Sequence, residues 1–531
     1  MEKDNDSKED STTAPTTPAT SSTASSEDGR GIFEDSDSYS DISQKTFVGK
    51  VWHYLKSIRM EPGFLIYMTA SVMGNIIASD LQIDRACRIN IGYNDTVCNG
   101  VMSSNQTIKR RYKSEEEDVQ KVISEIGIWS EVVENLFPIV FSLFLGTWSD
   151  VYGYKLPFLL AISGVTIRYA GLILCTYFNT WNAEIVALFS VLPGSLTGGR
   201  IAISMVVYSF VAVTSTLKER TVRMGILTAV RTFGRSSGSA LGGYLKRSGK
   251  NYYFIFSLGG GLSLLSFLYI LLIMPNPKKG NNPCGFKQDS KLEATKNIFN
   301  WKNVIESAKA FFKKREYGVR EQLFLLVAIL IFTMAPMQGE DSTLLLFVRN
   351  KLNWSTADYS EYGTFRMLIA FGGGLMSVGV LVTWLEVADW KLGCISCVSQ
   401  VAGSLVYAFA NNTLMMYIAP VVDILNGTMI IASRAMISKI SPIAEMGKIN
   451  SFIAVIDSTT PLWGNPLYQA VYRGTLDDFP GAFFILSAAL TIPPLFLFSY
   501  FGWTKKGIPV HEQAARRNNK STTEITDMKP I

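Results

Sequence analysis

Charged residues are scarce in this chain: Asp, Glu, Lys and Arg make up 18% of its 531 residues, whereas apolar residues make up 48%. Soluble domains carry about a quarter charged residues. Many apolar runs of about 20 residues follow one another, and each is long enough to cross a bilayer. The composition therefore excludes an ordinary soluble protein and predicts an integral multi-pass membrane protein.

Histidine is almost absent, since the chain has only His53 and His511, and both lie outside the apolar runs. The six cysteines form no zinc-ligand spacing with histidine, so we expect no metal site and no cofactor. A membrane-embedded enzyme would need a nucleophile–base pair or a metal, and no such constellation is visible. The chain also lacks the Gly-x-x-x-x-Gly-Lys-Ser/Thr phosphate loop, which argues against ATP-driven pumping.

No cleavable signal peptide is visible, because the chain starts Met-Glu-Lys-Asp-Asn-Asp. The first apolar helix must therefore direct insertion. The net charge of +6 needs no nucleic-acid partner, because the basic residues lie mostly in loops and tails on one predicted side of the bilayer. We expect the plasma membrane as the location, with the lysosomal or endosomal membrane as the alternative.

The apolar runs form two groups of six, with both chain ends on the cytoplasmic side. We expect a disordered cytoplasmic tail at 1–58, a first half at 59–274, a cytoplasmic loop at 275–321, a second half at 322–503 and a cytoplasmic tail at 504–531. The expected spans are 62–81, 125–148, 156–178, 184–213, 221–247, 252–274, 322–348, 358–385, 390–410, 413–439, 446–472 and 479–503.

A long polar loop at 82–124 follows the first span. It carries two glycosylation sequons, at Asn94 and Asn105, and therefore reads as extracellular or lumenal. Cys87 and Cys98 lie in the same loop, where an oxidising compartment would allow a disulfide between them. Two free thiols are the alternative.

The loop between the halves contains an apolar pattern at helical spacing, with lysines between its members. The residues are Trp301, Val304, Ile305, Ala308 and Phe312. Such a pattern predicts an amphipathic helix lying on the inner face of the membrane.

Between the second and third spans lies the pattern Gly-x-x-x-Asp-x-x-Gly-x-Lys-x-Pro, from Gly146 to Pro157. The glycine at 146 allows a neighbouring backbone to approach, and Gly153 permits a tight turn. Asp150 can accept hydrogen bonds from the N-terminus of an adjacent helix. An ordinary membrane hairpin is the alternative interpretation.

In context this motif resembles the signature between helices 2 and 3 of the major facilitator superfamily of transporters. It departs from the family pattern at Tyr154, where a basic residue is usual. The resemblance implies an all-α membrane protein with twelve transmembrane helices in two six-helix halves.

Ionisable residues inside the spans each cost about 2.5–3.5 kcal/mol to insert, so they are expected to face water or a partner. Arg231 and Arg235 lie four residues apart, on one side of a helix, and Arg200 lies in the preceding span. With Asp341 and Asp457 they are our candidate substrate-binding residues. Guanidinium groups bind carboxylates and phosphates with two parallel hydrogen bonds, which favours an organic anion as cargo.

The alternative for these arginines is structural: each could pair with Glu131, Glu134 or Asp341. A second set of residues is predicted to act in coupling or gating. It comprises Glu134, Glu340, Asp423, Arg434, Asp150, Gly146 and Gly153. With no histidine in the spans, coupling to protons would depend on carboxylates.

Several stretches in both halves together resemble solute carrier family 46, the group that contains the proton-coupled folate transporter. They include the run Arg220-Thr221-Val222-Arg223-Met224. The full set is 145–157, 209–224, 340–341, 353–354, 433–439 and 479–481.

The resemblance implies a helix 10 arginine at Arg434 and a helix 7 aspartate at Asp341. Three polar positions that the family's folate transporter uses are replaced here, by Val213, Thr228 and Pro336. These departures argue against folate and leave proton coupling open. Other branches of the family are linked to steroid conjugates and muramyl peptides.

The sequence as a whole predicts a secondary active transporter of a small organic anion that works by alternating access, with protons as a possible second cargo. The cargo is expected to be of the folate, steroid-conjugate or muramyl-peptide class. A non-transporting receptor or scaffold that retains the fold is the alternative. A scaffold need not keep arginines at mid-depth in two spans.

Overall fold

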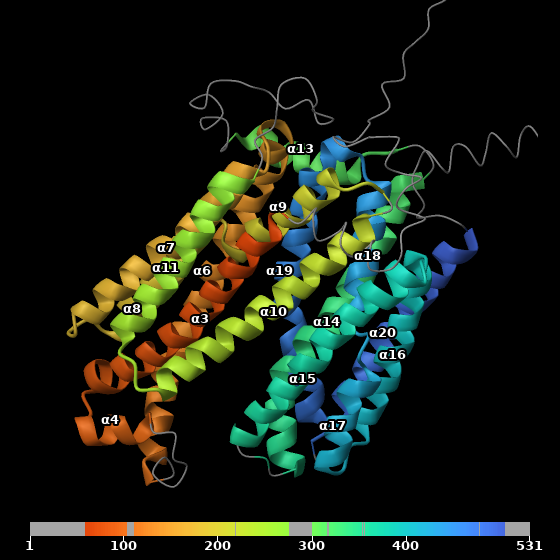
Figure 1. The fold of residues 1–531 in the computed structure, drawn as a ribbon. Helices are drawn as coiled ribbons and strands as arrows, with labels where there is room; N and C mark the ends of the chain where they lie inside the picture. The colour runs from red at the N-terminus through yellow and green to blue at the C-terminus, as the bar shows by residue number, and fades with distance from the viewer. Residues whose placement is uncertain are drawn as a thin grey trace, which may run out of the picture.

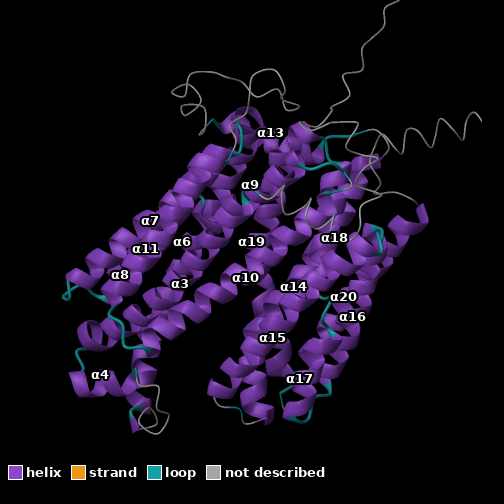
Figure 2. Cartoon of the chain, in the orientation of Figure 1, coloured by secondary structure: helices purple, strands orange, loops and turns teal. Residues whose placement is uncertain are grey.

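The computed structural model describes residues 59–102, 111–217, 219–274, 300–315, 318–352, 354, 356–476 and 478–504. These residues are almost entirely helical and contain no strand (Figure 2). The helices form two groups, one from each half of the sequence, that lean against each other (Figure 1). The expected tails and the glycosylation site at Asn105 lie outside the described residues.

The first half contains six spans and one short helix, α4, in the loop after the first span. Its elements are α3 Glu61–Arg85 with its π-helical extension η2 Ala86–Ile91, α4 Asp95–Val101, α6 Lys113–Tyr152, α7 Lys155–Tyr177, α8 Ala183–Leu196, α9 Gly199–Thr214, α10 Arg220–Arg247 and α11 Tyr252–Ile273.

The second half repeats this plan after a separate helix, α13, that precedes it. The elements are α13 Trp301–Phe312, α14 Val319–Leu352, α15 Thr356–Met376 with η4 Ser377–Trp384, α16 Asp389–Ala408, α17 Thr413–Val422, α18 Thr428–Ile440, η5 Ile443–Glu445, α19 Met446–Gly474 and α20 Ala482–Thr504.

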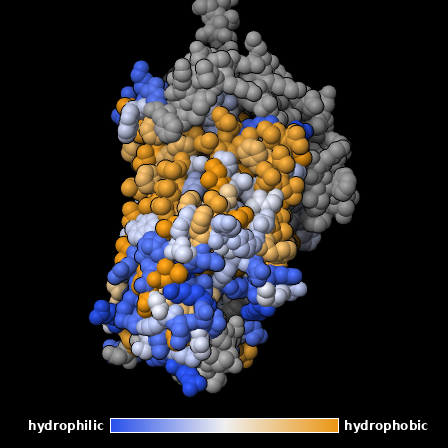
Figure 3. Space-filling model, turned by 90° about the vertical axis from the view of Figure 1, so that its left-hand side faces the viewer, coloured by the Kyte–Doolittle hydropathy of each residue, from blue (hydrophilic) through white to orange (hydrophobic). Residues whose placement is uncertain are grey.

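Eight helical stretches within the described residues are long and apolar enough to cross a membrane on length and composition alone. The other four spans are α10, α16, α19 and the pair α17 and α18, which are more polar or broken. Figure 3 shows a broad apolar band across the first half, above a hydrophilic end. The arrangement agrees with the expected twelve-helix fold.

Two of the expected spans, at 184–213 and 413–439, each consist of two helices rather than one continuous helix. The fourth span breaks between α8 and α9, where Gly198 and Gly199 both have positive φ. The tenth span breaks between α17 and α18, in the turn 423–427 that follows Pro420. Each break occupies the fourth span of its half, so the two halves repeat one plan.

The predicted polar loop at 82–124 is also shorter than expected. Helix α3 continues through η2 to Ile91, and α6 begins at Lys113 rather than near 125. Charged and polar residues occupy both helix ends there, so hydropathy alone ends the spans too early. In this region the helices extend beyond the apolar segments that cross the bilayer.

Candidate functional site

The two halves meet at the end of the molecule that carries α13, at the top of Figure 1. Asp150, at the end of α6, accepts hydrogen bonds from the backbone N–H groups of Gly447 at 2.6 Å and Lys448 at 3.0 Å. These are free N–H groups at the start of α19, where the helix dipole favours negative charge. The predicted contact of Asp150 with a helix N-terminus is therefore present, and it joins the halves.

Tyr154, which stands where the family usually has a basic residue, forms a hydrogen bond with Asp150. Its hydroxyl group donates a hydrogen bond of 2.6 Å to Asp150 Oδ1, one turn away on the chain. A buried carboxylate needs several donors to offset its lost hydration. Here a phenol supplies a donor at the position where the family usually has a basic residue.

Glycines allow this junction to close. A side chain on Gly447 would lie 2.6 Å from Asp150 Oδ1, from the carbonyl oxygen of Gly146 and from Ser149 Oγ. A side chain on Gly146 would in turn meet Ser451 and the backbone of α19. Gly153 has φ of 96°, which the turn after α6 requires. Gly146 thus lies at a close approach of two helices, as its place in the motif predicted. Gly447 was not identified from the sequence.

A second junction between the halves lies at the same end, between α10 and the second half. Lys439 of α18 pairs with Asp389 at 2.6 Å, and both bind the Thr221 hydroxyl group of α10 at 2.7 Å. The buried Arg220 donates to the backbone carbonyl of Ser438. This end of the molecule is therefore closed.

Farther from this end, α10 carries both exposed side chains and buried residues such as Gly238. Arg220 is 2% exposed, whereas Phe233 is 46% exposed and Arg235 is also exposed. On the facing half, the side chain of Asp341 is 53% exposed. Charged side chains that are exposed within spans face water rather than lipid. We infer a water-accessible space between the halves that opens away from the α13 end.

Three arginines of the first half lie close to one another in this region. Arg200 and Arg231 both lie near enough to Arg235 to interact with it electrostatically, as does Asp341 of α14. Arg200 stands one residue after the break between α8 and α9, at the start of α9. The sequence-predicted set Arg200, Arg231, Arg235 and Asp341 is therefore brought together in one region.

These arginines are not paired with carboxylates in the part of the chain that the structure describes. Arg200 donates to the amide oxygen of Asn135 at 3.5 Å, while Arg231 and Arg235 form no ion pair or hydrogen bond with described residues. No salt bridge therefore joins these arginines to Glu131, Glu134 or Asp341 among the described residues, although Asp341 and Arg235 interact electrostatically. Asp341 instead pairs with Arg366 of α15 at 2.6 Å.

A second charged group lies where α9, α18 and α19 meet. Arg434 of α18 is buried and pairs with Asp457 of α19. Its guanidinium group also lies over the ring of Tyr208 from α9, 3.9 Å from the ring centre, as a cation–π contact. Asp457, predicted as a substrate residue, and Arg434, predicted as a gate residue, therefore form one unit that touches both halves.

The predicted coupling carboxylates lie in three different surroundings. Glu340 is 4% exposed, and its Oε1 has no hydrogen-bond partner among described residues. Asp423 sits in the break between α17 and α18, not inside a helix as expected, and accepts a hydrogen bond from Asn426 at 2.8 Å. Glu134 is exposed on α6.

The positions that replace polar residues of the folate transporter are unreactive here. Val213 is buried in the core of the first half, and Pro336 is buried within α14. The Thr228 hydroxyl group donates to the carbonyl oxygen of Met224 in its own helix at 2.9 Å. None of the three presents a titratable group to the space between the halves.

At the opposite end of the molecule, a disulfide joins Cys87 and Cys98 and ties η2 to α4. Asn94 is exposed and caps α4 by accepting a hydrogen bond from the Val97 N–H at 3.0 Å. This bond uses the side-chain oxygen and leaves the amide nitrogen, to which a glycan would attach, free of it. Glycosylation at Asn94 stays a prediction.

Sequence reasoning missed two residues of this region, Arg366 and Tyr208. Arg366 is a charge within an apolar run, the same signal that identified Arg231, and could have been found by that rule. Tyr208 carries no such signal, because a single tyrosine in an apolar helix is usual. Only its contact with Arg434 distinguishes it.

A sequence profile of the Major Facilitator Superfamily matches residues 124–464, more than half of the chain. The chain belongs to the major facilitator superfamily. Its fold class and its integral, multi-pass membrane nature follow from this membership and from the apolar helices.

Several relatives are named members of solute carrier family 46. A "probable peptidoglycan muropeptide transporter SLC46" of Drosophila melanogaster is 26% identical over 81% of this chain and 83% of that protein. A "lysosomal proton-coupled steroid conjugate and bile acid symporter SLC46A3" of Rattus norvegicus is 21% identical over 87% of this chain and 99% of that protein. The predicted relation to family 46 is confirmed, and the chain is a solute transporter.

Solved structures share the fold at low identity. The human organic anion transporter MFSD10 superposes with a TM-score of 0.61 at 13% identity, covering 83% of this chain and 99% of that one. The E. coli fucose:proton symporter FucP superposes with a TM-score of 0.55, also at 13% identity and with 83% and 99% coverage. These similarities establish the fold alone.

Proposed function

We propose that the chain carries a small organic anion across the membrane by alternating access of its two halves. The observation that carries this proposal is the group Arg200, Arg231 and Arg235, which no described carboxylate neutralises by an ion pair. A cation that is kept unpaired within a span needs a compensating partner for part of the cycle. An anionic cargo is such a partner.

The surrounding backbone supports the same charge preference. The break between α8 and α9 places the N-terminus of α9, with its positive dipole end, next to Arg200 within the fourth span. Broken helices whose N-termini meet anionic groups of the substrate are a recurring arrangement in secondary transporters. Guanidinium groups add planar, two-pronged hydrogen bonding to a carboxylate.

The names of the relatives narrow the cargo class. Muropeptides, steroid conjugates and bile acids combine an acidic group with a larger body that is not uniformly charged. We propose that this chain carries a molecule of that kind, with the acidic group on the three arginines. The replacements at Val213, Thr228 and Pro336 argue against folate.

Uptake by cells that express the chain tests this proposal. Labelled muramyl dipeptide, a labelled bile acid and a labelled reduced folate are the probes. Arg231→Gln and Arg235→Gln should each lower saturable uptake by at least tenfold, because each removes a charge-assisted hydrogen bond of about 1.5–3 kcal/mol. Arg247→Gln, at the exposed end of the same helix, is the matched control and should transport normally.

Two results would contradict the proposal. If both variants reach the surface in normal amount and transport as well as the unaltered chain, the arginines do not bind cargo. If none of the three probes is taken up while a neutral or cationic solute is, the charge class is wrong. A scaffold without transport would take up no solute of any charge.

We propose further that protons are the coupling ion and that Glu340 carries them. Glu340 is buried in α14 and forms no salt bridge with the described residues, although Arg366 lies near enough to interact with it electrostatically. Buried carboxylates within spans mark proton relays in transporters. Glu340→Gln should abolish the stimulation of uptake by an acidic exterior, yet keep exchange of labelled for unlabelled cargo. Glu321→Gln, exposed on the same helix, should keep both. Acid stimulation that survives Glu340→Gln would rule this residue out.

A further inference from the structure

Helix α13 lies across the seam between the halves. From the first half, Leu143 of α6 accepts a hydrogen bond from Ser307 at 3.0 Å, and Thr147 donates to the carbonyl oxygen of Asn303 at 2.8 Å. Both contacts hold α13 by its buried side. Since α6 contacts α19 directly beside it, α13 sits over the closed junction.

The second half holds the other end of α13. Phe311 stacks on Phe452 of α19, with ring centres 4.2 Å apart, and meets Phe324 of α14 edge-on at 5.1 Å. The Glu306 carboxylate of α13 also pairs with Lys448 at 3.2 Å. Lys448 is a residue whose backbone N–H binds Asp150. Helix α13 is therefore linked to the junction itself.

A second side of α13 is apolar yet exposed. Trp301 is 69%, Ile305 50% and Phe312 54% exposed. Steps of four and seven residues place all three on one side of the helix. Val304, which the sequence pattern grouped with them, instead turns partly toward the protein. An exposed stripe with a tryptophan beside a lysine-rich side is typical of a helix lying in the lipid interface.

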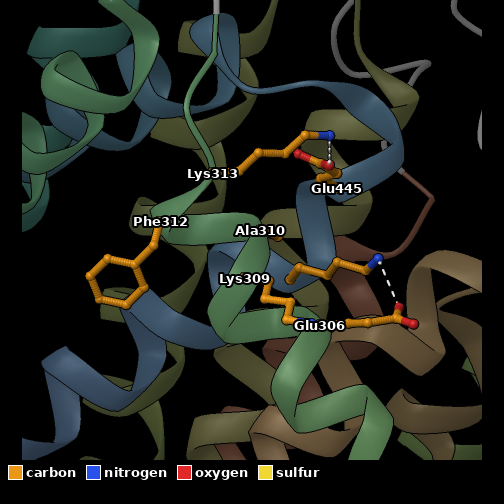
Figure 4. Close-up of a pocket in the computed structure, with 7 residues that line it drawn as sticks. Glu306, Lys309, Ala310, Phe312, Lys313 and Glu445 are labelled. Atoms are coloured by element: carbon orange, nitrogen blue, oxygen red, sulfur yellow. Dashed lines mark hydrogen bonds and ion pairs between the residues drawn. The ribbon is translucent and has the colours of Figure 1, made fainter.

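The third side of α13 borders a surface cavity of about 550 Å³, shown in Figure 4. Lysines and glutamates line it together with Ala310 and Phe312; the charged residues are Lys309, Lys313, Lys448, Glu306 and Glu445. The charges do not cancel, because Arg315 also binds Glu445, at 2.6 Å. Lys313 lies 3.5 Å from the same carboxylate, and Lys309 has no ion pair with a described residue.

We propose that the headgroup of an anionic phospholipid binds in this cavity, with Lys309 as its main contact, and that its acyl chains lie along Trp301, Ile305 and Phe312. The cavity supplies the charge and the adjacent stripe supplies the apolar surface, so one amphiphilic molecule satisfies both. A free phosphate or a soluble anion would use only the cavity.

Occupation of this site acts on the conformation. A lipid bound to α13 holds that helix against both α6 and α19, and therefore stabilises the state in which the α13 end is closed. A lipid that binds one state better shifts the population toward it. The inference does not depend on which cargo the chain carries.

The test uses the purified full chain in nanodiscs of phosphatidylcholine, with or without phosphatidylserine. Its readout is the labelling rate of Ser451→Cys, a buried position that packs on Gly146 in the closed junction. Phosphatidylserine should slow labelling several-fold. In Lys309→Gln, about fivefold more phosphatidylserine should be needed for the same protection. One lysine near an anionic surface contributes about this factor to binding.

Matched variants separate the alternatives. Lys302→Gln removes the same charge from the same helix outside the cavity, and should preserve the protection. Trp301→Ser removes part of the apolar stripe and should weaken protection by the lipid. Labelled phosphatidylserine counted on each purified variant shows whether binding and protection change together.

Three results would overturn the proposal. Inorganic phosphate in phosphatidylcholine nanodiscs could protect as well as phosphatidylserine, which would make the site one for free anions. Lys302→Gln could weaken protection as much as Lys309→Gln, which would reduce it to a general surface charge. Phosphatidylserine could bind without changing labelling, which would remove the link to closure.

Discussion

Arg434 illustrates how single residues connect the two halves. It is buried, pairs with Asp457, and covers the ring of Tyr208. Removing one member of a buried pair leaves the other charge uncompensated, which costs roughly 3 kcal/mol. Removing both charges costs much less.

We therefore expect Arg434→Gln and Asp457→Asn each to lower the melting temperature of the purified protein, and the double variant to recover much of the loss. Differential scanning fluorimetry of the three variants measures this directly. Losses that simply add in the double variant would mean that the two residues do not interact. Tyr208→Leu should lower stability less than either, because it removes only the cation–π contact.

Residues also show how far sequence reasoning reaches. The hydrogen-bonding role of Asp150 was predictable, because a carboxylate in a fixed motif between two spans has few chemical options. The pairing of Asp341 with Arg366, rather than with a first-half arginine, was not. It depends on which sides of α14 and α15 face each other, and the sequence does not encode that pairing locally.

At the scale of elements, the junction between α6 and α19 depends on their close approach. The backbones approach at Gly146 and Gly447, where an added side chain would collide with backbone and Asp150. A larger residue at either position therefore forces the helices apart and opens this end of the molecule.

Gly447→Ala should raise the labelling rate of Ser451→Cys and lower the affinity for cargo offered from the opposite side. Gly474→Ala, at the end of the same helix, meets no atom within 4 Å and is the control. Equal labelling in both variants would show that the glycine contact does not limit opening. Unfolding would also raise the labelling rate, because it exposes the buried position 451, so the melting temperature of each variant is measured alongside.

The breaks in the fourth and tenth spans are the elements that the sequence predicted least well. The break at Gly198 coincides with a short polar run, Thr197 to Arg200, that a hydropathy window of about 19 residues averages out. Its signal is the pair Gly198 and Gly199, which adopt positive φ. Glycines are also frequent in unbroken membrane helices, which is why the pattern alone could not separate the two cases.

For the molecule as a whole, apolar runs predicted the number of spans and their two groups, and the motif from Gly146 to Pro157 predicted the superfamily. The sequence did not predict which conformation the molecule adopts, with the α13 end closed. Closure at the α13 end depends on contacts between residues hundreds of positions apart, such as Thr221 with Asp389 and Asp150 with Gly447. From these contacts we infer a space that opens at the other end, where the arginines lie.

The central claim is that this space binds the negative charge of an organic molecule. Purified protein in liposomes should take up a labelled bile acid saturably, and its uncharged amide should neither be carried nor compete. Arg231→Gln should remove the difference between acid and amide by lowering uptake of the acid. Equal transport or equal competition by the amide would contradict the claim, because the arginines would then have no part in choosing the cargo.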